Sequence, residues 1–408
     1  MAFLSLLDDR AKPKGSRDPL GFEVVWSYFG RKVIGNLTTI TSSMDNFSVA
    51  VLGFYWANKL VPAEVNEDRA KQVRNWFIRY EQMTGYIRHY GGATDIMGIT
   101  RIKNRIRDEK KVSFGLDAEQ QILSDQASYG LWGLYSAASR DTRLVEGESR
   151  NPTGVGQDIA LTIINELGSS ADELFRLMQS DNVIDGEHLK EYGTAFMQAV
   201  RHEKVREKLL DTLMSGNKRK ELQQELWQKT QSIFSQAKGG EEPDDIGTFV
   251  DAVLDQKPSN GLVSALTDIK KIERLLVAIN DIFHYTRSKD GTKLDEILSE
   301  LNDRPYHYLP SSLPVDDFHH RQQLASILDA FHQNDFNRVV CEILKLNKTV
   351  MHDRGAAPWV ELKMKKIYVK VKSEVSMLKG VEYLEDGWDY DYFLGSFLQI
   401  ARQQLGVS

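Results

Sequence analysis

Cysteine is almost absent from this sequence, because Cys341 is the only one among 408 residues. A single thiol cannot form a disulfide within the chain, which is typical of proteins from a reducing compartment. Long apolar runs are also missing: the longest, Phe47–Ala57, has eleven residues, and a membrane-spanning helix needs about 20. The first residues, MAFLSLLDDRAK, place acids directly after a short apolar run, unlike a secretory signal. We therefore expect a soluble cytoplasmic protein that has no membrane partner.

Sequence signatures of metal binding and catalysis are equally scarce. The nine histidines are scattered, no His-Glu-x-x-His stretch occurs, and one cysteine cannot supply a Cys-x-x-Cys pair. No Gly-x-Ser-x-Gly elbow is present, and neither glycine-rich turn, 91–98 or 153–158, has the form of a P-loop. For the second turn, a helix cap by Thr153 is the simpler interpretation. We accordingly predict no metal site and no cofactor.

One short pattern leaves an enzymatic function open. Glu361 and Lys363 form an acid-x-lysine pair of the kind found in magnesium-dependent nucleases. However, apolar residues from Val360 to Leu378 recur at spacings of three and four, which predicts a helix over 363–378. The nuclease pair normally lies on a strand, so Glu361 and Lys363 are weak catalytic candidates. We lean towards a protein that is not an enzyme.

Basic residues are concentrated in the first part of the chain, although the net charge is −6. Up to Gly115 there are 18 Lys and Arg against 12 Asp and Glu, and the remainder has 34 against 46. The densest block is RIKNRIRDEKK, at 101–111, whose basic residues are Arg101, Lys103, Arg105, Arg107, Lys110 and Lys111. Such asymmetry indicates a surface that contacts a partner.

Residues 99–111 fit an amphipathic helix, with Ile99, Ile102 and Ile106 as a narrow apolar stripe. The basic side chains would then face outwards and bind phosphates of DNA or RNA, or an acidic protein surface. A solvated helix face, or contact with the acidic remainder of the chain, is the alternative. Because the whole chain is acidic, we expect nucleic-acid binding only within a larger complex.

Helical periodicity predominates along the chain, notably over 66–90, 218–238 and 262–285, so we predict a mainly α, multi-domain protein. Its length indicates two or three domains. We predict an N-terminal helical domain over 1–168, a helical middle domain over 169–302, a proline-rich linker over 303–317 and a C-terminal helical domain over 318–408. A short apolar piece, a turn and a helix start within 142–162 suggest a small winged-helix-like element around 125–165, with a helix–loop–helix as the alternative.

Three segments of the chain resemble a bacterial family described only as a domain of unknown function. They are PLGFEVVWSYFGRKVIGNLTTITSSMDNFSVAVLGFYWANKL (19–60), the stretch from Gly98 to YGLWGLYSAASRDTRLV (129–145), and RGAAPWVEL (354–362) followed by YFLGSFLQIARQQLGV (392–407). Their order and spacing are similar over most of the chain. Members of such families are often encoded among bacterial antiviral defence genes, beside helicases, ATPases or nucleases. The resemblance implies a component of a defence complex and supplies no catalytic residue.

These observations together favour a non-catalytic subunit or adaptor of a bacterial anti-phage defence complex. It would contact nucleic acid or a partner protein, such as a helicase, ATPase or nuclease, through the basic helix. One alternative is a magnesium-dependent nuclease subunit of such a system. Another is a structural protein that self-assembles through its amphipathic helices.

Overall fold

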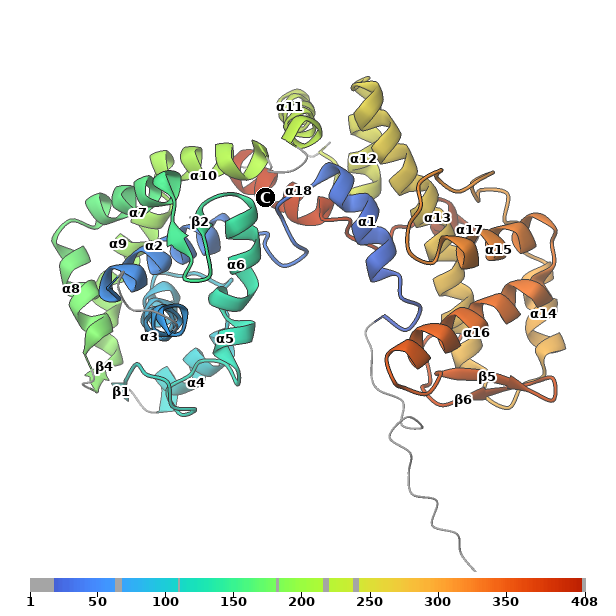
Figure 1. Cartoon of the computed structure of the whole chain (residues 1–408), viewed down its shortest axis with the longest axis horizontal. Helices are drawn as coiled ribbons and strands as arrows, with labels where there is room; N and C mark the ends of the chain where they lie inside the picture. The colour runs from blue at the N-terminus through green and yellow to red at the C-terminus, as the bar shows by residue number, and fades with distance from the viewer. Residues whose placement is uncertain are drawn as a thin grey trace, which may run out of the picture. The chain divides into compact units, whose positions relative to one another are not determined.

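The computed structural model confirms that the protein is mainly α-helical (Figure 1). It describes residues 18–62, 68–108, 111–180, 183–215, 220–237 and 242–405. No helix in these ranges is both long enough and apolar enough to cross a bilayer. The contacts group the chain into two compact units: unit 1 is Met1–Val33 with Pro243–Tyr392, and unit 2 is Ile34–Glu242 with Phe393–Ser408. Each unit thus combines segments that are distant in the sequence, whereas the three consecutive domains stay a prediction.

Unit 2 is organised around two long helices, α2 (Met44–Leu60) and α3 (Arg69–Tyr90), which pack against each other. The other elements are α4 (Ile99–Asp108), α5 (Gln126–Tyr129), α6 (Leu131–Asp141), α7 (Gly154–Leu167), α8 (Ser169–Gln179), α9 (Gly186–Val200), α10 (Glu203–Ser215), α11 (Lys220–Gln236) and α18 (Leu394–Leu405), with the strand pairs β1 (Lys111–Val112) and β4 (Ile184–Asp185), and β2 (Val145–Glu146) and β3 (Asn151–Pro152). Figure 1 shows α3 almost along its axis, with α8 and α9 on one side and α6 on the other.

The sequences of α2 and α3 explain their central position. α2 is apolar on nearly all sides and is buried along most of its length, as expected for a helix surrounded by others. α3 buries Val73, Phe77 and Tyr80, which helical spacing places on one side, and every residue from Tyr80 to Arg88 is buried. The rings of Phe54 and Phe77 stack across the two helices at a centroid distance of 4.7 Å. Burying a side chain of this size contributes about 1.5–3 kcal/mol.

The short apolar piece, turn and helix start predicted within 142–162 correspond to the β2–β3 strand pair with its connecting loop, followed by α7. The Oγ atom of Thr153 accepts a hydrogen bond from the Gly156 N–H at 3.3 Å, so the predicted helix cap is confirmed. Asn58 of α2 fixes the loop between the strands, because its Nδ2 donates to the carbonyls of Ser149 and Arg150 at 3.0 and 3.1 Å. The winged-helix assignment of this element stays a prediction.

Unit 1 is arranged along α13 (Asn260–Ser288), which confirms the helix predicted over 262–285. Its other elements are α1 (Glu23–Val33), α12 (Ile246–Asp255), α14 (Leu294–Asn302), α15 (Arg321–His332), α16 (Phe336–Asp353), β5 (Val360–Lys363), β6 (Lys366–Val369) and α17 (Val381–Asp386). α1, α12, α16, α17 and β6 all contact α13. Residues 303–317 have neither helix nor strand. They connect α14 to α15, and they bury Tyr306, Tyr308 and Leu309.

The helix predicted over 363–378 is wrong. β5 and β6 form an antiparallel hairpin with Leu362 opposite Ile367, and no helix follows before α17. Met364 and Lys365 make the turn with φ angles of 49° and 61°, as a two-residue hairpin of the favoured twist requires. The spacing of three and four misled because it combined strand residues with later residues such as Val375, which is exposed. Alternating burial around Ile367 is the pattern that matters here.

Backbone contact between α9 and the end of α3 generates a prediction about stability. A Cβ atom on Gly193 would lie 2.7 Å from the Gly91 nitrogen and 2.9 Å from the Tyr90 carbonyl carbon. Gly193→Ala should therefore force the helices apart and lower the free energy of unfolding by about 1–3 kcal/mol, measured by urea denaturation. Gly154→Ala is the control, because open space surrounds this position in the first turn of α7. Equal stability of both variants would contradict the close contact.

Candidate functional site

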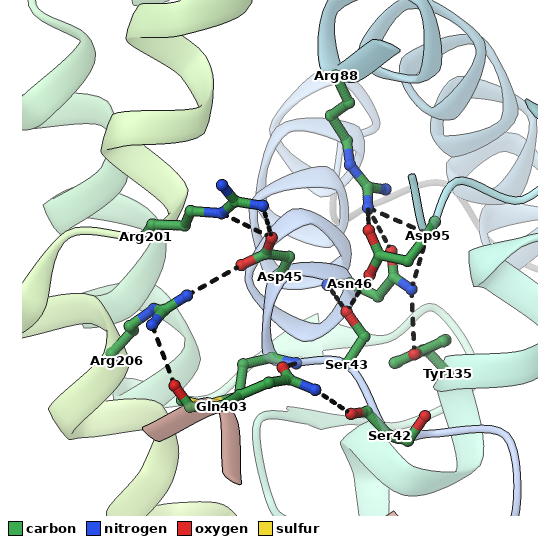
Figure 2. A network of polar contacts seen from close by, with 11 residues as sticks. Ser42, Ser43, Asp45, Asn46, Arg88, Asp95, Tyr135, Arg201, Arg206 and Gln403 are labelled. Carbon is green, nitrogen blue, oxygen red and sulfur yellow. Dashed lines mark hydrogen bonds and ion pairs between the residues drawn. The ribbon is translucent and has the colours of Figure 1, made fainter. Parts of the chain in front are cut away.

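A network of polar side chains surrounds the first turn of α2 in unit 2 (Figure 2). Its members come from the start of α2, from α3 and the loop after it, and from α6, α10, α18 and the α9–α10 connection. They are Ser42, Ser43, Asp45, Asn46, Arg88, Asp95, Tyr135, Arg201, Arg206 and Gln403. Ser43 is the N-cap of α2, and its Oγ accepts a hydrogen bond from the Asn46 N–H at 3.2 Å. Serine is among the preferred residues at this position, so local sequence begins the helix here.

Arg88 supplies a positive charge to the interior of this network. It belongs to α3, and only 1% of its surface is exposed. Its Nη2 atom donates to Asn46 Oδ1 at 2.7 Å, and to the backbone oxygen and Oδ1 of Asp95 at 3.3 Å each. The Ser43 hydroxyl donates to the other carboxylate oxygen of Asp95. Asp95 thus joins the cap of α2 to the end of α3, and its charge compensates that of Arg88.

Asn46 and Tyr135 extend the network towards α6. The Asn46 Nδ2 atom donates to the Asp95 carbonyl at 3.3 Å and to the Tyr135 hydroxyl oxygen at 3.2 Å. Burial raises the pKa of Tyr135 to about 12, and the hydrogen bond from Asn46 opposes this shift. The hydroxyl therefore stays protonated near neutral pH. A phenol with this pKa is poorly matched to general acid–base catalysis at pH 7.

Two further contacts hold the start of α2. Asp45 binds two arginines, and Gln403 of α18 forms hydrogen bonds with the backbone of Ser42 and Met44. The Asp45 Oδ2 atom lies 2.8 Å from Nε and 2.7 Å from Nη2 of Arg201, and Oδ1 lies 3.6 Å from Nη2 of Arg206. Gln403 of α18 accepts from the Met44 N–H at 3.0 Å and donates to the Ser42 carbonyl at 2.7 Å. An acid in the first turn also interacts favourably with the helix dipole.

The network is best explained as structural: its hydrogen bonds and ion pairs connect the start of α2 to the surrounding helices of unit 2, and we call this set of contacts the structural tie. Each of its charged side chains has an oppositely charged partner within it, and Tyr135 keeps its proton. The sequence analysis did not find these residues. One signal was available: Arg88 follows Tyr80 and Thr84 at intervals of four in the second half of α3, which is buried on all sides, and a buried charge needs a partner.

The predicted basic helix exists as α4, and two of its arginines point inwards. Ile102 is completely buried. Arg101 Nη1 donates to the Gln121 carbonyl at 2.8 Å. Arg105 donates to the carbonyls of Gln120 and Gln121 at 2.9 and 3.0 Å, and also to that of Glu119. These arginines therefore attach α4 to the loop 119–121.

The remaining basic residues of the segment differ in their surroundings. Lys103 and Arg107 are exposed on α4, and Arg107 forms an ion pair with the neighbouring Asp108 at 2.7 Å. Lys111 is exposed on β1, where it pairs in register with Asp185 of β4. Lys110 lies outside the described residues. The outward basic surface of the described segment thus consists of Lys103, Arg107 and Lys111.

Glu361 and Lys363 lie on β5, so the acid-x-lysine pair is on a strand after all. Glu361 Oε2 is 2.9 Å from Lys363 Nζ and 3.2 Å from Lys370 Nζ. The hydrogen bond from Lys363 is the main reason why the pKa of Glu361 is lowered. Among the described residues, no group of three or more His, Cys, Asp or Glu side chains is placed to hold a metal ion.

Glu273 of α13 is a buried acid that connects two segments of unit 1. Its Oε1 atom accepts hydrogen bonds from the N–H groups of Asp389 and Tyr390, the latter at 3.1 Å, and Oε2 accepts from the Tyr392 hydroxyl at 2.8 Å. Glu273 also lines a cavity of about 230 Å³, together with Lys270 of the same helix and residues of α12 and of the segment 385–388. Burial raises the pKa of Glu273 to about 8, although the hydrogen bonds oppose this. α13 thereby holds residues 389–392 through one carboxyl group.

Comparisons with models of protein families, with curated proteins and with solved structures find no match to this chain. The functional argument that follows therefore depends on the residues themselves.

Replacing Arg88 tests whether the network is a structural tie. Arg88→Ala should lower the free energy of unfolding by about 3 kcal/mol, measured by urea denaturation, because Asn46 and Asp95 lose a buried charged donor. Arg88→Lys keeps the charge without the planar fork, so its loss should be smaller. Lys71→Ala, at an exposed position of the same helix, should stay within about 0.5 kcal/mol of the wild type. An Arg88→Ala protein as stable as Lys71→Ala would refute the tie.

The raised pKa of Glu273 predicts how stability depends on pH. Between its unfolded value of 4.5 and about 8, the folded protein holds a proton that the unfolded chain has released. This group therefore lowers stability as pH rises through that window, by up to about 1.4 kcal/mol per pH unit. Glu273→Gln mimics the protonated group, so the variant should lose this part of the decline. Thermal unfolding from pH 4 to 9 measures it, and parallel profiles for both proteins would contradict the prediction.

Proposed function

We propose that this protein is a non-catalytic subunit or adaptor of a bacterial anti-phage defence complex. It contacts nucleic acid or a partner protein through the exposed side of α4, in the cytoplasm. The resemblance of 19–60, 98–145 and the C-terminal segments to a family encoded among defence genes supports the setting. The partners are then other proteins of the complex, such as a helicase, ATPase or nuclease.

The attachment of α4 is the observation that carries this proposal. Arg101 and Arg105 bind backbone carbonyls of unit 2, and Ile102 of the same helix is buried. This anchoring leaves Lys103 and Arg107 exposed on a helix that is already fixed. Ordering the contact surface before binding reduces the entropy lost on association, which favours a binding role. An adaptor needs such a surface and no reactive group.

The alternatives from the sequence stay hypotheses. The position of Glu361 on a strand is the feature in favour of a magnesium-dependent nuclease subunit, whereas its two ion pairs with lysines favour a structural role. Self-assembly through amphipathic helices has no particular support from the described contacts.

Charge reversal on the exposed side of α4 tests the adaptor. Lys103→Glu combined with Arg107→Glu should reduce co-purification of proteins encoded beside this gene, or retention of nucleic acid, by about tenfold or more, because attraction becomes repulsion. Phage protection in cells should fall in parallel. The fold should be unaffected, since neither side chain makes the inward bonds of Arg101 and Arg105.

A matched control changes the same charge elsewhere on unit 2. Lys190→Glu combined with Lys204→Glu reverses two exposed lysines on α9 and α10 and should leave binding and protection unchanged. If the α4 variant and this control both behave as the wild type, α4 is not the contact surface and the proposal fails.

A further inference from the structure

A cavity of about 480 Å³ lies within unit 1, beside the second half of α13. Small-molecule sites in proteins have volumes of roughly 300–1,000 Å³ and combine apolar walls with a few convergent polar groups. The aromatic and polar side chains that matter here are Trp26, Asn280, His284, Arg287, Trp359 and Tyr390. We call this space the α13 cavity.

Arg287 places a positive charge in the wall of the α13 cavity. Only 6% of its surface is exposed, and its Nε and Nη2 atoms donate to the carbonyls of Val371 and Lys372 at 3.0 Å each. Its guanidinium lies over the Trp359 ring, 4.5 Å from the ring centre. Within the part of the chain that the structure describes, no carboxylate forms an ion pair with Arg287. A buried charge without a counter-charge is costly, so a bound anion would stabilise it.

His284 and Trp359 add hydrogen-bond donors to the same wall. The Arg287 Nη1 atom lies 3.4 Å from His284 Nδ1, and because a guanidinium can only donate, Nδ1 accepts. Burial lowers the pKa of His284 and the charge of Arg287 lowers it further, so the ring is neutral with its proton on Nε2. The buried Nε1 of Trp359 has no hydrogen-bond partner among the described residues. These groups favour a ligand that is rich in acceptors.

Aromatic rings form another part of the wall. The rings of Trp26 and Tyr390 are nearly parallel, with an interplanar angle of 22° and centroids 6.5 Å apart, and both residues are half-buried. Aromatic faces of this kind stack on flat rings, including every nucleobase. Asn280 donates through Nδ2 to Asp389 Oδ2 at 3.1 Å, and its amide oxygen can accept from an amino group on a ring edge. This combination favours a heteroaromatic ring over a plain hydrocarbon ring.

Two carboxylates also line the α13 cavity, on its N-terminal segment. Asp18 accepts from the N–H groups of Phe22 and Glu23 at 2.7 and 3.1 Å and lies 3.3 Å from Nη2 of Arg354, so its charge is compensated. Glu23 is exposed, where water screens its charge. An anionic group is therefore expected beside Arg287 and away from these two acids.

The walls are fixed in the absence of a ligand. Asn347 of α16 donates through Nδ2 to the Pro19 carbonyl and accepts through Oδ1 from the Trp359 N–H, both at 2.9 Å. One side chain thus connects the N-terminal wall of the cavity to the tryptophan under Arg287. A site that is ordered before binding loses less entropy when the ligand enters.

We propose that the α13 cavity binds a nucleoside monophosphate, with its phosphate beside Arg287 and His284 and its base against Trp26 and Tyr390. This class of molecule joins a heteroaromatic ring to an anion whose oxygens a guanidinium binds well. The cavity volume matches one small molecule. The site lies in unit 1 and does not involve α4, so the inference goes beyond the adaptor function and is tested separately from it.

The test is isothermal titration calorimetry of the full chain with AMP, GMP, CMP and UMP, with the four nucleosides, and with sodium phosphate. At least one nucleotide should bind with one site per chain, and its nucleoside and inorganic phosphate should each bind at least tenfold more weakly. His284→Asn retains an acceptor near the Nδ1 position and loses the Nε2 donor. It should weaken nucleotide binding about tenfold and leave nucleoside binding unchanged, which a merely structural role would not produce.

His352→Asn is the matched control, because it makes the same change at an exposed position of α16 and should bind as the wild type does. Thermal unfolding without ligand establishes that both variants are folded. The inference is overturned if none of the four nucleotides binds, if a nucleoside or inorganic phosphate binds as tightly as the nucleotide, or if the two histidine variants bind equally. The comparison of ligands on the wild-type chain decides the matter even if His284→Asn does not fold.

Discussion

The buried charge of Arg88 is the constraint around which unit 2 is arranged. A guanidinium in the interior is tolerated only where acceptors and a negative charge surround it, and removing one partner costs more than the pair contributes. Asp95, Asn46 and the carbonyl of residue 95 meet this need, and they can do so only if the loop 91–98 folds back over the start of α2. The charge of Arg88, near the end of α3, thereby fixes the position of the start of α2 through Asn46 and Asp95.

Local periodicity was enough to predict much of the fold. The helices over 66–90, 218–238 and 262–285 have regular apolar spacing and appear as α3, α11 and α13 with small changes at their ends. Thr153 could be assigned as a cap because capping depends on a few neighbouring residues. The hairpin β5–β6 was missed because its strands are short, and a turn at two non-glycine residues with positive φ leaves no sequence signal.

The candidate site could not be predicted to the same extent. Asp45 with Arg201, and Ser42 with Gln403, are pairs separated by more than 150 residues, and no periodicity links them. The basic segment shows a related limit. Composition identified the cations of this segment correctly. Their different roles depend on the position of the loop 119–121, whose carbonyls bind Arg101 and Arg105 but not Lys103 and Arg107. A count of charges cannot distinguish an anchor from a contact surface.

The discontinuous make-up of unit 2 has a consequence for synthesis in the cell. Its last helix, α18, is translated after the whole 243–392 segment of unit 1, at a rate of about 5–20 residues per second. Until then the Met44 N–H and the Ser42 carbonyl lack Gln403. Unit 2 can therefore be completed only after the 243–392 segment of unit 1 and then α18 have been synthesised. A partner that recognises finished unit 2 would thus associate after translation of α18, and nascent chains stalled within 243–392 would escape it.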